Sequence, residues 1–212
     1  MSGLSKTLPV PYFTQPTGIT CQSTVLKMFA SYLERTVGLK STGAGERAIP
    51  DIWKDVNQDP KRPSKMRNAH SNMKWWLEEH FPGLQFVYEQ VDGEDKAIEK
   101  IVSFIDKNFP VLVSVSHANV KGHIILVIGY ENYFPNMSSM DFKLVVHDPY
   151  GQFDPSLKSE LFGKRRWEGG MSLLGGGESA PGKGTKLGVG SVNRHRLGDA
   201  MSGKYILLSA NR

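Results

Sequence analysis

The sequence predicts an α+β protein in which an N-terminal helical part packs on a C-terminal antiparallel β-sheet. Apolar residues recur with helical spacing up to Pro110, and alternating, strand-like segments follow that residue. Helices that precede strands favour an α+β fold over an alternating, doubly wound one. The 212 residues suit one domain, residues 1–212, for which we expect a helical part at about 18–109 and a sheet part at about 110–212.

We expect the chain to begin with an extended segment that leads into a helix. Residues 4–20 are rich in Pro, Gly and Thr and should run over the surface. From Cys21 onward, apolar residues repeat at helical spacing, which predicts a helix that ends at about Thr36. Thr20 can cap this helix, so Cys21 lies in its first turn.

Three shorter helices and one strand are expected before residue 110. Pro near a helix start and Gly or Pro after a helix end mark the boundaries. The helices are predicted at Pro50–Asn57, Asn72–His80 and about Ala97–Ile105, and the strand at Leu84–Glu89.

The rest of the sequence is rich in strand-forming residues. Strands are predicted at Val111–Ser116, His123–Tyr130, Leu144–His147 and Lys204–Ser209. Residues 169–190 contain nine glycines and no periodic apolar face, so we expect a mobile loop or an inserted flap there. The spacing of a phosphate-binding loop is absent from this segment.

The composition excludes several classes of protein and of site. A single Cys rules out an intramolecular disulfide and a four-thiolate zinc site. The net charge of +5 is too small to indicate a nucleic-acid-binding protein. No histidines or carboxylates have metal-ligand spacing, so we expect neither a metal nor an organic cofactor.

Neither a membrane anchor nor a secretory signal is expected. The chain has no run of about 18 apolar residues, and its N-terminus lacks a continuous apolar core. We therefore expect synthesis in the cytoplasm, which is compatible with later export by a leaderless secretion system.

Cys21, His123 and Asp148 together indicate nucleophilic catalysis. A thiol at a helix N-terminus has a lowered pKa, because the free amides and the helix dipole favour the anion. A neighbouring imidazole can accept the thiol proton and later protonate a leaving group, while a carboxylate fixes the imidazole tautomer. The separation of 25 residues between His123 and Asp148 leaves room for two adjacent strands that bring both to one end of the sheet.

Gln15 is the fourth residue of the candidate catalytic site. It precedes the Cys21 thiol by six residues and lies in the segment that must pass the start of the helix. Its amide and the Cys21 N–H can form an oxyanion hole, in which one donor is typically worth about 3 kcal/mol. The structural alternatives are an inert buried thiol and a solvated loop glutamine. Of the other histidines, His117 falls in a loop and His147 should point to the opposite sheet face, so we favour His123 as the base.

Four segments combine these residues into a signature: VPYFTQPTGITCQSTVLKMFASYL, PVLVSVSHANVKGHIILVIGYE, LVVHDPYG and GKYILLS. Its parts are Q-x5-C, a G-H pair followed by an apolar strand and G-Y, and a strand that ends in D-P. The signature covers roughly residues 9–151 and the last strand. It resembles papain-like cysteine peptidases related to the peptidase domain of bacteriocin-processing ABC transporters. The resemblance implies a papain-like fold with Cys21 as nucleophile, His123 as base, Asp148 as orienter and Gln15 at the oxyanion hole.

The chain departs from this family in three respects. Gln22 and Ser23 follow the cysteine, where stand-alone members often have Gly-Pro or Gly-Ala. Neither an ATP-binding cassette nor a membrane segment is present in this sequence, so transporter-coupled leader processing is not expected. The glycine-rich segment 169–190 is a further departure.

We therefore expect a stand-alone cysteine peptidase that hydrolyses peptide bonds of a protein substrate. The same residues would suit a peptidoglycan amidase or a glutamine deamidase, and a binding module without turnover is the alternative outside enzymes. Small stand-alone members of such families also occur as toxins, so an antagonistic bacterial effector with an immunity protein as partner is a further expectation.

Overall fold

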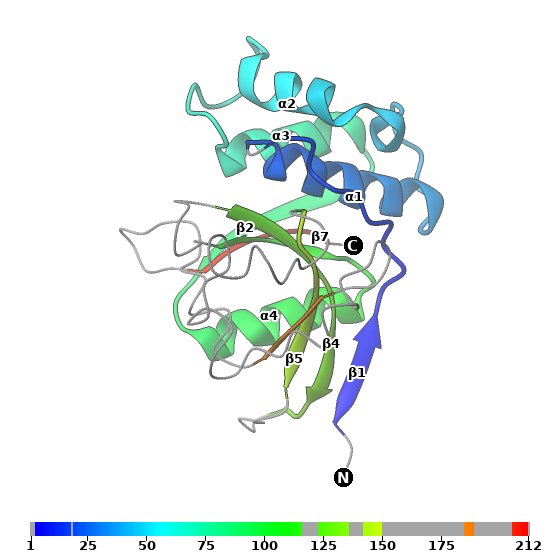
Figure 1. Cartoon of the computed structure of the whole chain (residues 1–212), viewed down its shortest axis with the longest axis vertical. Coiled ribbons are helices and arrows are strands. Elements are labelled where there is room, and N and C mark those ends of the chain that lie inside the picture. The colour runs from blue at the N-terminus through cyan, green and yellow to red at the C-terminus, as the bar shows by residue number, and fades with distance from the viewer. Residues whose placement is uncertain are drawn as a thin grey trace.

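The structure, a computed structural model, describes residues 3–17, 19–115, 123–135, 142–149, 185–188 and 205–211. In these residues, helices pack on a seven-stranded sheet in which every pairing is antiparallel (Figure 1). The predicted α+β class is confirmed. The helices are α1 (Cys21–Arg35), the 3-10 helix η1 (Ala44–Glu46), α2 (Ile49–Gln58), α3 (His70–His80) and α4 (Glu94–Asp106). The strands are β1 (Leu4–Thr7), β2 (Gln85–Val91), β3 (Val111–Val115), β4 (His123–Tyr133), β5 (Lys143–His147), β6 (Thr185–Gly188) and β7 (Tyr205–Asn211).

The strands follow the order β2-β7-β3-β4-β5-β6, and β1 also pairs with β4. Strand β4 is long enough for two neighbours on one side, because β3 pairs with its first half and β1 with its second half. Two strands that precede residue 110 therefore belong to the same sheet as the later strands.

Helices cover both faces of the sheet (Figure 1). On β2, the Tyr88 ring lies 5.9 Å from the ring of His70 in α3. The next residue, Glu89, forms a 2.5 Å ion pair with Lys100 of α4. Since successive strand residues point to opposite faces, α3 and α4 lie on opposite sides of the sheet.

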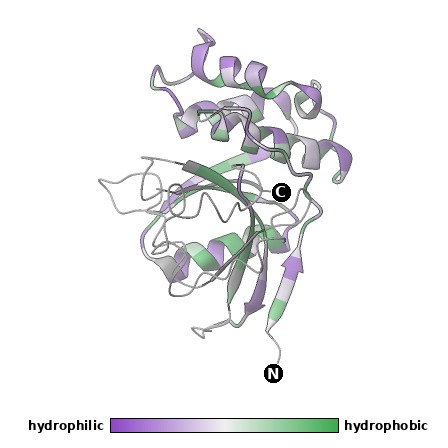
Figure 2. Ribbon diagram, in the orientation of Figure 1, coloured by the Kyte–Doolittle hydropathy of each residue, from purple (hydrophilic) through white to green (hydrophobic). Residues whose placement is uncertain are grey.

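The core joins the helices to the sheet through aromatic and aliphatic side chains. Phe29 of α1 meets Phe86 of β2 edge to face, with ring centroids 6.2 Å apart. Figure 2 shows how hydrophobic residues dominate the central strands while the helices α1 and α2 carry mixed faces. The largest fully buried side chains come from the helices α1, α2, α3 and α4, from the residue after α3 and from strand β3: Trp76, Phe29, Phe81, Leu26, Met28, Leu33, Ile52, Met73, Leu77, Ile101, Ile105 and Leu112. Burial of these side chains supplies the main stabilisation of the fold.

The N-terminal segment differs from the expected surface course. Residues 4–7 form strand β1, and Leu8 and Val10 are buried. The reason is Gly129 of β4, where a Cβ atom would lie 2.8 Å from Thr7 Cα and collide with Lys6 O. The absent side chain lets β1 approach β4, and this contact over long sequence separation leaves no local pattern in residues 4–7.

Two further expectations were wrong in part. Thr20 occupies the N-cap position of α1 but makes no side-chain cap hydrogen bond, because its hydroxyl donates to Thr17 O at 3.0 Å instead. Residues 185–188, expected within a loop, form β6 and pair with β5. Hydrogen bonding to β5 decides this strand, whereas the sequence around it is dominated by glycine. The remainder of segment 169–190 lies outside the described residues.

None of the helices in the described part of the chain is long and apolar enough to cross a membrane.

Candidate active site

Cys21 is the first residue of α1, as the helical periodicity predicted. It keeps 9% of its surface exposed, whereas the next three residues of the helix are fully buried. Cys21 is therefore a buried residue, although less completely buried than the three residues that follow it.

The start of α1 is electrostatically suited to an anion. The first hydrogen bond of the helix runs from Thr24 N to Thr20 O and is 2.9 Å long. The backbone N–H groups of residues 21–23 therefore lie before the first helical hydrogen bond, at the positive end of the helix. The first turn contains no acidic residue that would oppose a thiolate. The hydroxyls of Ser23 and Thr24 both donate to Thr20 O, which fixes the backbone just before the cysteine. A thiolate at Cys21 would be stabilised by the positive end of the helix dipole.

The residue Asp148 directly follows β5 and is joined to the N-terminal segment by hydrogen bonds. Tyr12 donates its hydroxyl to the backbone oxygen of Asp148 at 2.9 Å. Gln15 donates its backbone N–H to Pro149 O at 2.7 Å. The end of β5 is thereby tied to the segment that leads into α1.

Gln15 turns its side chain toward the start of α1. Its Nε2 donates to Thr17 O at 2.7 Å, and the same carbonyl accepts the hydroxyl of Thr20. This bond identifies Nε2 as the atom next to Thr17, because an oxygen there would face another oxygen. An amide nitrogen carries two N–H groups, so one of them is occupied by Thr17 O. The other polar atom of the Gln15 amide, Oε1, is buried and has no hydrogen-bond partner among the described residues.

His123 is the first residue of β4 and pairs with Val115 of β3. On the other side of β4, Leu126 is paired with His147, the last residue of β5. The start of β4 and the end of β5 therefore lie at the same end of the sheet, which puts the backbones of His123 and Asp148 near each other. The side chain of His123 lies outside the described residues.

His147 and His117 are the alternatives to His123 for the role of base. His147 is buried, its Nε2 hydrogen bonds to Val10 O at 2.9 Å, and its ring lies against Tyr12. Burial lowers the pKa of His147, and the bond to Val10 only partly offsets this effect. His147 thus anchors the N-terminal segment to β5. His117 lies outside the described residues.

Two polar contacts beside these residues have no signal in the sequence. Gln22, which follows the cysteine, is fully buried and accepts a 3.0 Å hydrogen bond from Asn57 of α2. His70 hydrogen bonds through Nε2 to Ser114 of β3, across the junction of helices and sheet. Both pairs are more than thirty residues apart in the chain, so only the tertiary fold brings them together.

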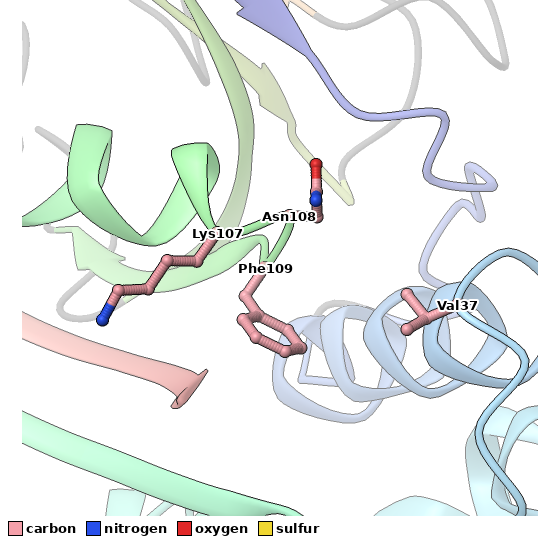
Figure 3. A pocket seen from close by; sticks show the side chains of 4 residues that line it. All are labelled: Val37, Lys107, Asn108 and Phe109. Atoms are coloured by element: carbon pink, nitrogen blue, oxygen red, sulfur yellow. The ribbon is translucent and has the colours of Figure 1, made fainter. Parts of the chain in front are cut away.

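A cavity of about 310 Å³ lies elsewhere, lined by Val37, Lys107, Asn108 and Phe109 (Figure 3). Val37 follows the C-terminal end of α1, which has 15 residues and is therefore about 22 Å long. This cavity is at the opposite end of the helix from Cys21. Within the described ranges, no three His, Cys, Asp or Glu side chains gather where they could hold a metal ion.

Comparison with known proteins gives a family relationship. A search of curated proteins finds no match. The family model described as "Peptidase_C39 like family" matches residues 7–169, a range that includes Gln15, Cys21, His123 and Asp148. Since this match covers well over half of the 212 residues, the chain belongs to the Peptidase_C39 like family, a family of cysteine peptidases.

Proposed function

We propose that the protein is a cysteine peptidase that hydrolyses peptide bonds of a protein substrate, with Cys21 as its nucleophile. The observation that carries this proposal is the placement of Cys21 at the start of α1, within a chain of the Peptidase_C39 like family. Thiolate attack on a carbonyl carbon would give an acyl-enzyme, which water then hydrolyses.

His123 takes the thiol proton in this mechanism and returns it to the leaving amine, and Asp148 orients the imidazole. The pairing of β4 with β5 supports these roles, because it brings the two backbones to one end of the sheet. Gln15 stabilises the oxyanion with the second N–H of its amide and with the backbone N–H of Cys21. The bond from Gln15 Nε2 to Thr17 O holds the amide close to the helix start.

Wild-type protein and Cys21→Ala should be incubated with a denatured bacterial proteome, followed by labelling of new peptide N-termini. We expect new termini with the wild type and none above background with Cys21→Ala. Equal sets of termini from both proteins would contradict a peptidase that uses Cys21. Conversion of glutamine to glutamate without new termini would indicate a deamidase instead.

The activated thiolate can be tested separately through iodoacetamide labelling at about pH 6, where an ordinary thiol reacts slowly. Cys21 is the only cysteine, so the intact mass reports its modification directly. We expect faster labelling than that of a free thiol, and slower labelling in His123→Ala. Labelling no faster than a free thiol would contradict the mechanism.

We further propose that the substrate belongs to a rival cell, so that the peptidase acts as an antagonistic effector with an immunity protein. Expression in a susceptible bacterium should then arrest growth with the wild type and not with Cys21→Ala. Equal growth arrest by both would favour a binding module over an enzyme.

A further inference from the structure

The segment between α2 and α3, residues 59–69, is here named the basic loop. It contains four cations, Lys61, Arg62, Lys65 and Arg67, against one carboxylate, that of Asp59. Three of these cations are exposed and Arg62 is half-buried. Met66, between two of them, is 74% exposed. The loop thus presents positive charge together with one apolar side chain.

The basic loop is held in place by buried asparagines. Asn72 accepts the N–H of Ser64 at 2.8 Å and donates to Ser64 O at 3.0 Å, which clamps the middle of the loop. Asn57 accepts the N–H of Asn68 at 2.7 Å, which fixes its end. The cations are therefore carried by a backbone of defined position.

The same contacts place the basic loop beside the candidate active site. Asn57 also donates to the side chain of Gln22, the neighbour of Cys21. The loop leads directly into His70, which bonds to Ser114 of β3. Ser114 pairs with Ile124, the residue after His123. The residues that flank the loop therefore contact the start of α1 and the strand paired with the start of β4, the two elements that carry the proposed nucleophile and base.

The charge of the loop is not neutralised by the carboxylates around it. Five other cations of the described residues are paired: Arg35 with Glu46, Arg47 with Asp55, Lys54 with Asp51, Lys74 with Glu78 and Lys100 with Glu89, whereas scattered lysines such as Lys40 and Lys96 are not. None of the four loop cations forms an ion pair with a carboxylate in the described part of the chain. A cluster of unpaired cations near a site favours binding of anionic groups and suppresses binding of cationic ones.

We propose that the basic loop selects polypeptide substrates that carry acidic residues next to the scissile bond. This inference rests on the proposed peptidase function, because it takes the occupant of the loop to be the substrate chain. Charge complementarity chooses the acidic residues, and Met66 would pack against an apolar neighbour of those residues in the substrate.

The test measures how fast charged peptides alkylate Cys21 and needs no turnover. Two peptides of equal length, one with three Glu and one with three Lys, are prepared with a chloroacetyl group at the N-terminus. A second pair carries a chloromethyl ketone at the C-terminus, so that both sides of the scissile bond are sampled. The intact mass of the protein gives each rate. In at least one pair we expect the Glu peptide to react about tenfold faster, the size that a few rim charges can give.

The double variant Lys61→Glu/Lys65→Glu should reverse or abolish the preference. Its control, Lys40→Glu/Lys96→Glu, makes the same change in net charge at exposed residues beyond the C-terminal end of α1 and on α4. The control should keep the preference, and added NaCl should weaken it. Circular dichroism checks that both variants are folded.

Equal rates for the Glu and Lys peptides, or the same loss of preference in both double variants, would overturn the selection of acidic substrates. The proposed function fails by a different result, namely Cys21 that reacts with neutral iodoacetamide no faster than a free thiol. The ratio of the two peptide rates is informative in either case, because it does not depend on how reactive the thiol is.

Discussion

Gly129 lacks a side chain at the point where β1 crosses β4. A Cβ atom there would meet backbone atoms of Lys6 and Thr7, which cannot move without displacing the strand. We expect Gly129→Ala to lower the free energy of unfolding by about 2 kcal/mol, as overpacking of a tight contact does. Urea denaturation followed by tryptophan fluorescence measures the change.

Gly83→Ala is the matched control, because a Cβ atom at Gly83 would meet nothing within 4 Å. That variant should have almost the stability of the wild type, or slightly more, since alanine restricts the unfolded chain. Equal stability of both variants would show that β1 does not approach β4 as closely as described.

His70 makes the stability of the fold depend on pH. Burial lowers the pKa of His70 to about 4, against 6.5 for an unperturbed histidine. The folded state favours the neutral form of His70. The contribution of His70 to the free energy of unfolding is therefore complete above about pH 6.5 and is lost as the pH falls toward 4. The loss is at most about 3 kcal/mol, from 1.36 kcal/mol for each pKa unit. The lowered pKa of buried His147 acts in the same direction.

We expect His70→Gln to flatten this pH dependence, because glutamine keeps a hydrogen bond to Ser114 but does not titrate. Urea midpoints between pH 7.5 and 4.5, each referred to the same protein at pH 7.5, give the comparison. A variant that loses as much stability as the wild type would exclude His70 as the source.

Among the elements, helices were predictable because their signal is local. The apolar repeat after Cys21 fixed α1 to within one residue of its observed end at Arg35. Strand β1 was not predictable, since Leu4–Thr7 contains little apolar alternation and its partner lies more than 120 residues away. The cap at Thr20 failed for a different, local reason, because the hydroxyl donates to Thr17 O in the turn before the helix.

The middle of the connection between α2 and α3 is held by the buried amide of Asn72. Asn72 bonds to Val56 O and to both backbone groups of Ser64. Asn72→Ala leaves the buried Val56 O and the half-buried backbone groups of Ser64 without this partner, so we expect a loss of about 2–3 kcal/mol in the free energy of unfolding. We also expect faster cleavage by trypsin after Lys65 and Arg67, measured by mass spectrometry at low protease concentration.

Asn211→Ala is the control for this element, because it removes a single exposed hydrogen bond from Lys107. That variant should leave the cleavage rate in the basic loop unchanged. If Asn72→Ala is cleaved there at the wild-type rate, the loop is fixed by contacts other than this amide.

At the scale of the whole molecule, the candidate site draws on three distant parts of the chain. The sequence motifs named Gln15, Cys21, His123 and Asp148 because each has a recognisable local context. The motifs could not show how those parts are held together, because the contacts between them are hydrogen bonds to backbone oxygens. Tyr12 donates to Asp148 O, Gln15 donates to Thr17 O, and His147 bonds to Val10 O. Such contacts place no restriction on sequence spacing.

The N-terminal segment has two roles: residues 4–7 add a strand to the sheet, and residues 8–15 hold the start of α1 against the sheet. Deletion of residues 1–7 removes the first role and leaves the second. The deletion removes the β1 ladder, the bond from Lys6 Nζ to Asp106 O and the bond from Asn132 N to Ser5 Oγ. We expect the free energy of unfolding to fall by about 3 kcal/mol, because a ladder bond contributes roughly 1 kcal/mol and the two exposed side-chain bonds contribute less. Deletion of residues 1 and 2 alone is the control and should have little effect.

Residues 8–15 keep their own anchors in the shortened chain, namely Leu8 N to Ile128 O, Val10 O to His147 and Gln15 N to Pro149 O. Iodoacetamide should therefore label Cys21 at a rate within about twofold of the full-length protein, under conditions where both are folded. Unchanged stability would show that β1 contributes nothing to the fold. A large fall in labelling, with the fold intact by circular dichroism, would show that β1 is needed to position the start of α1.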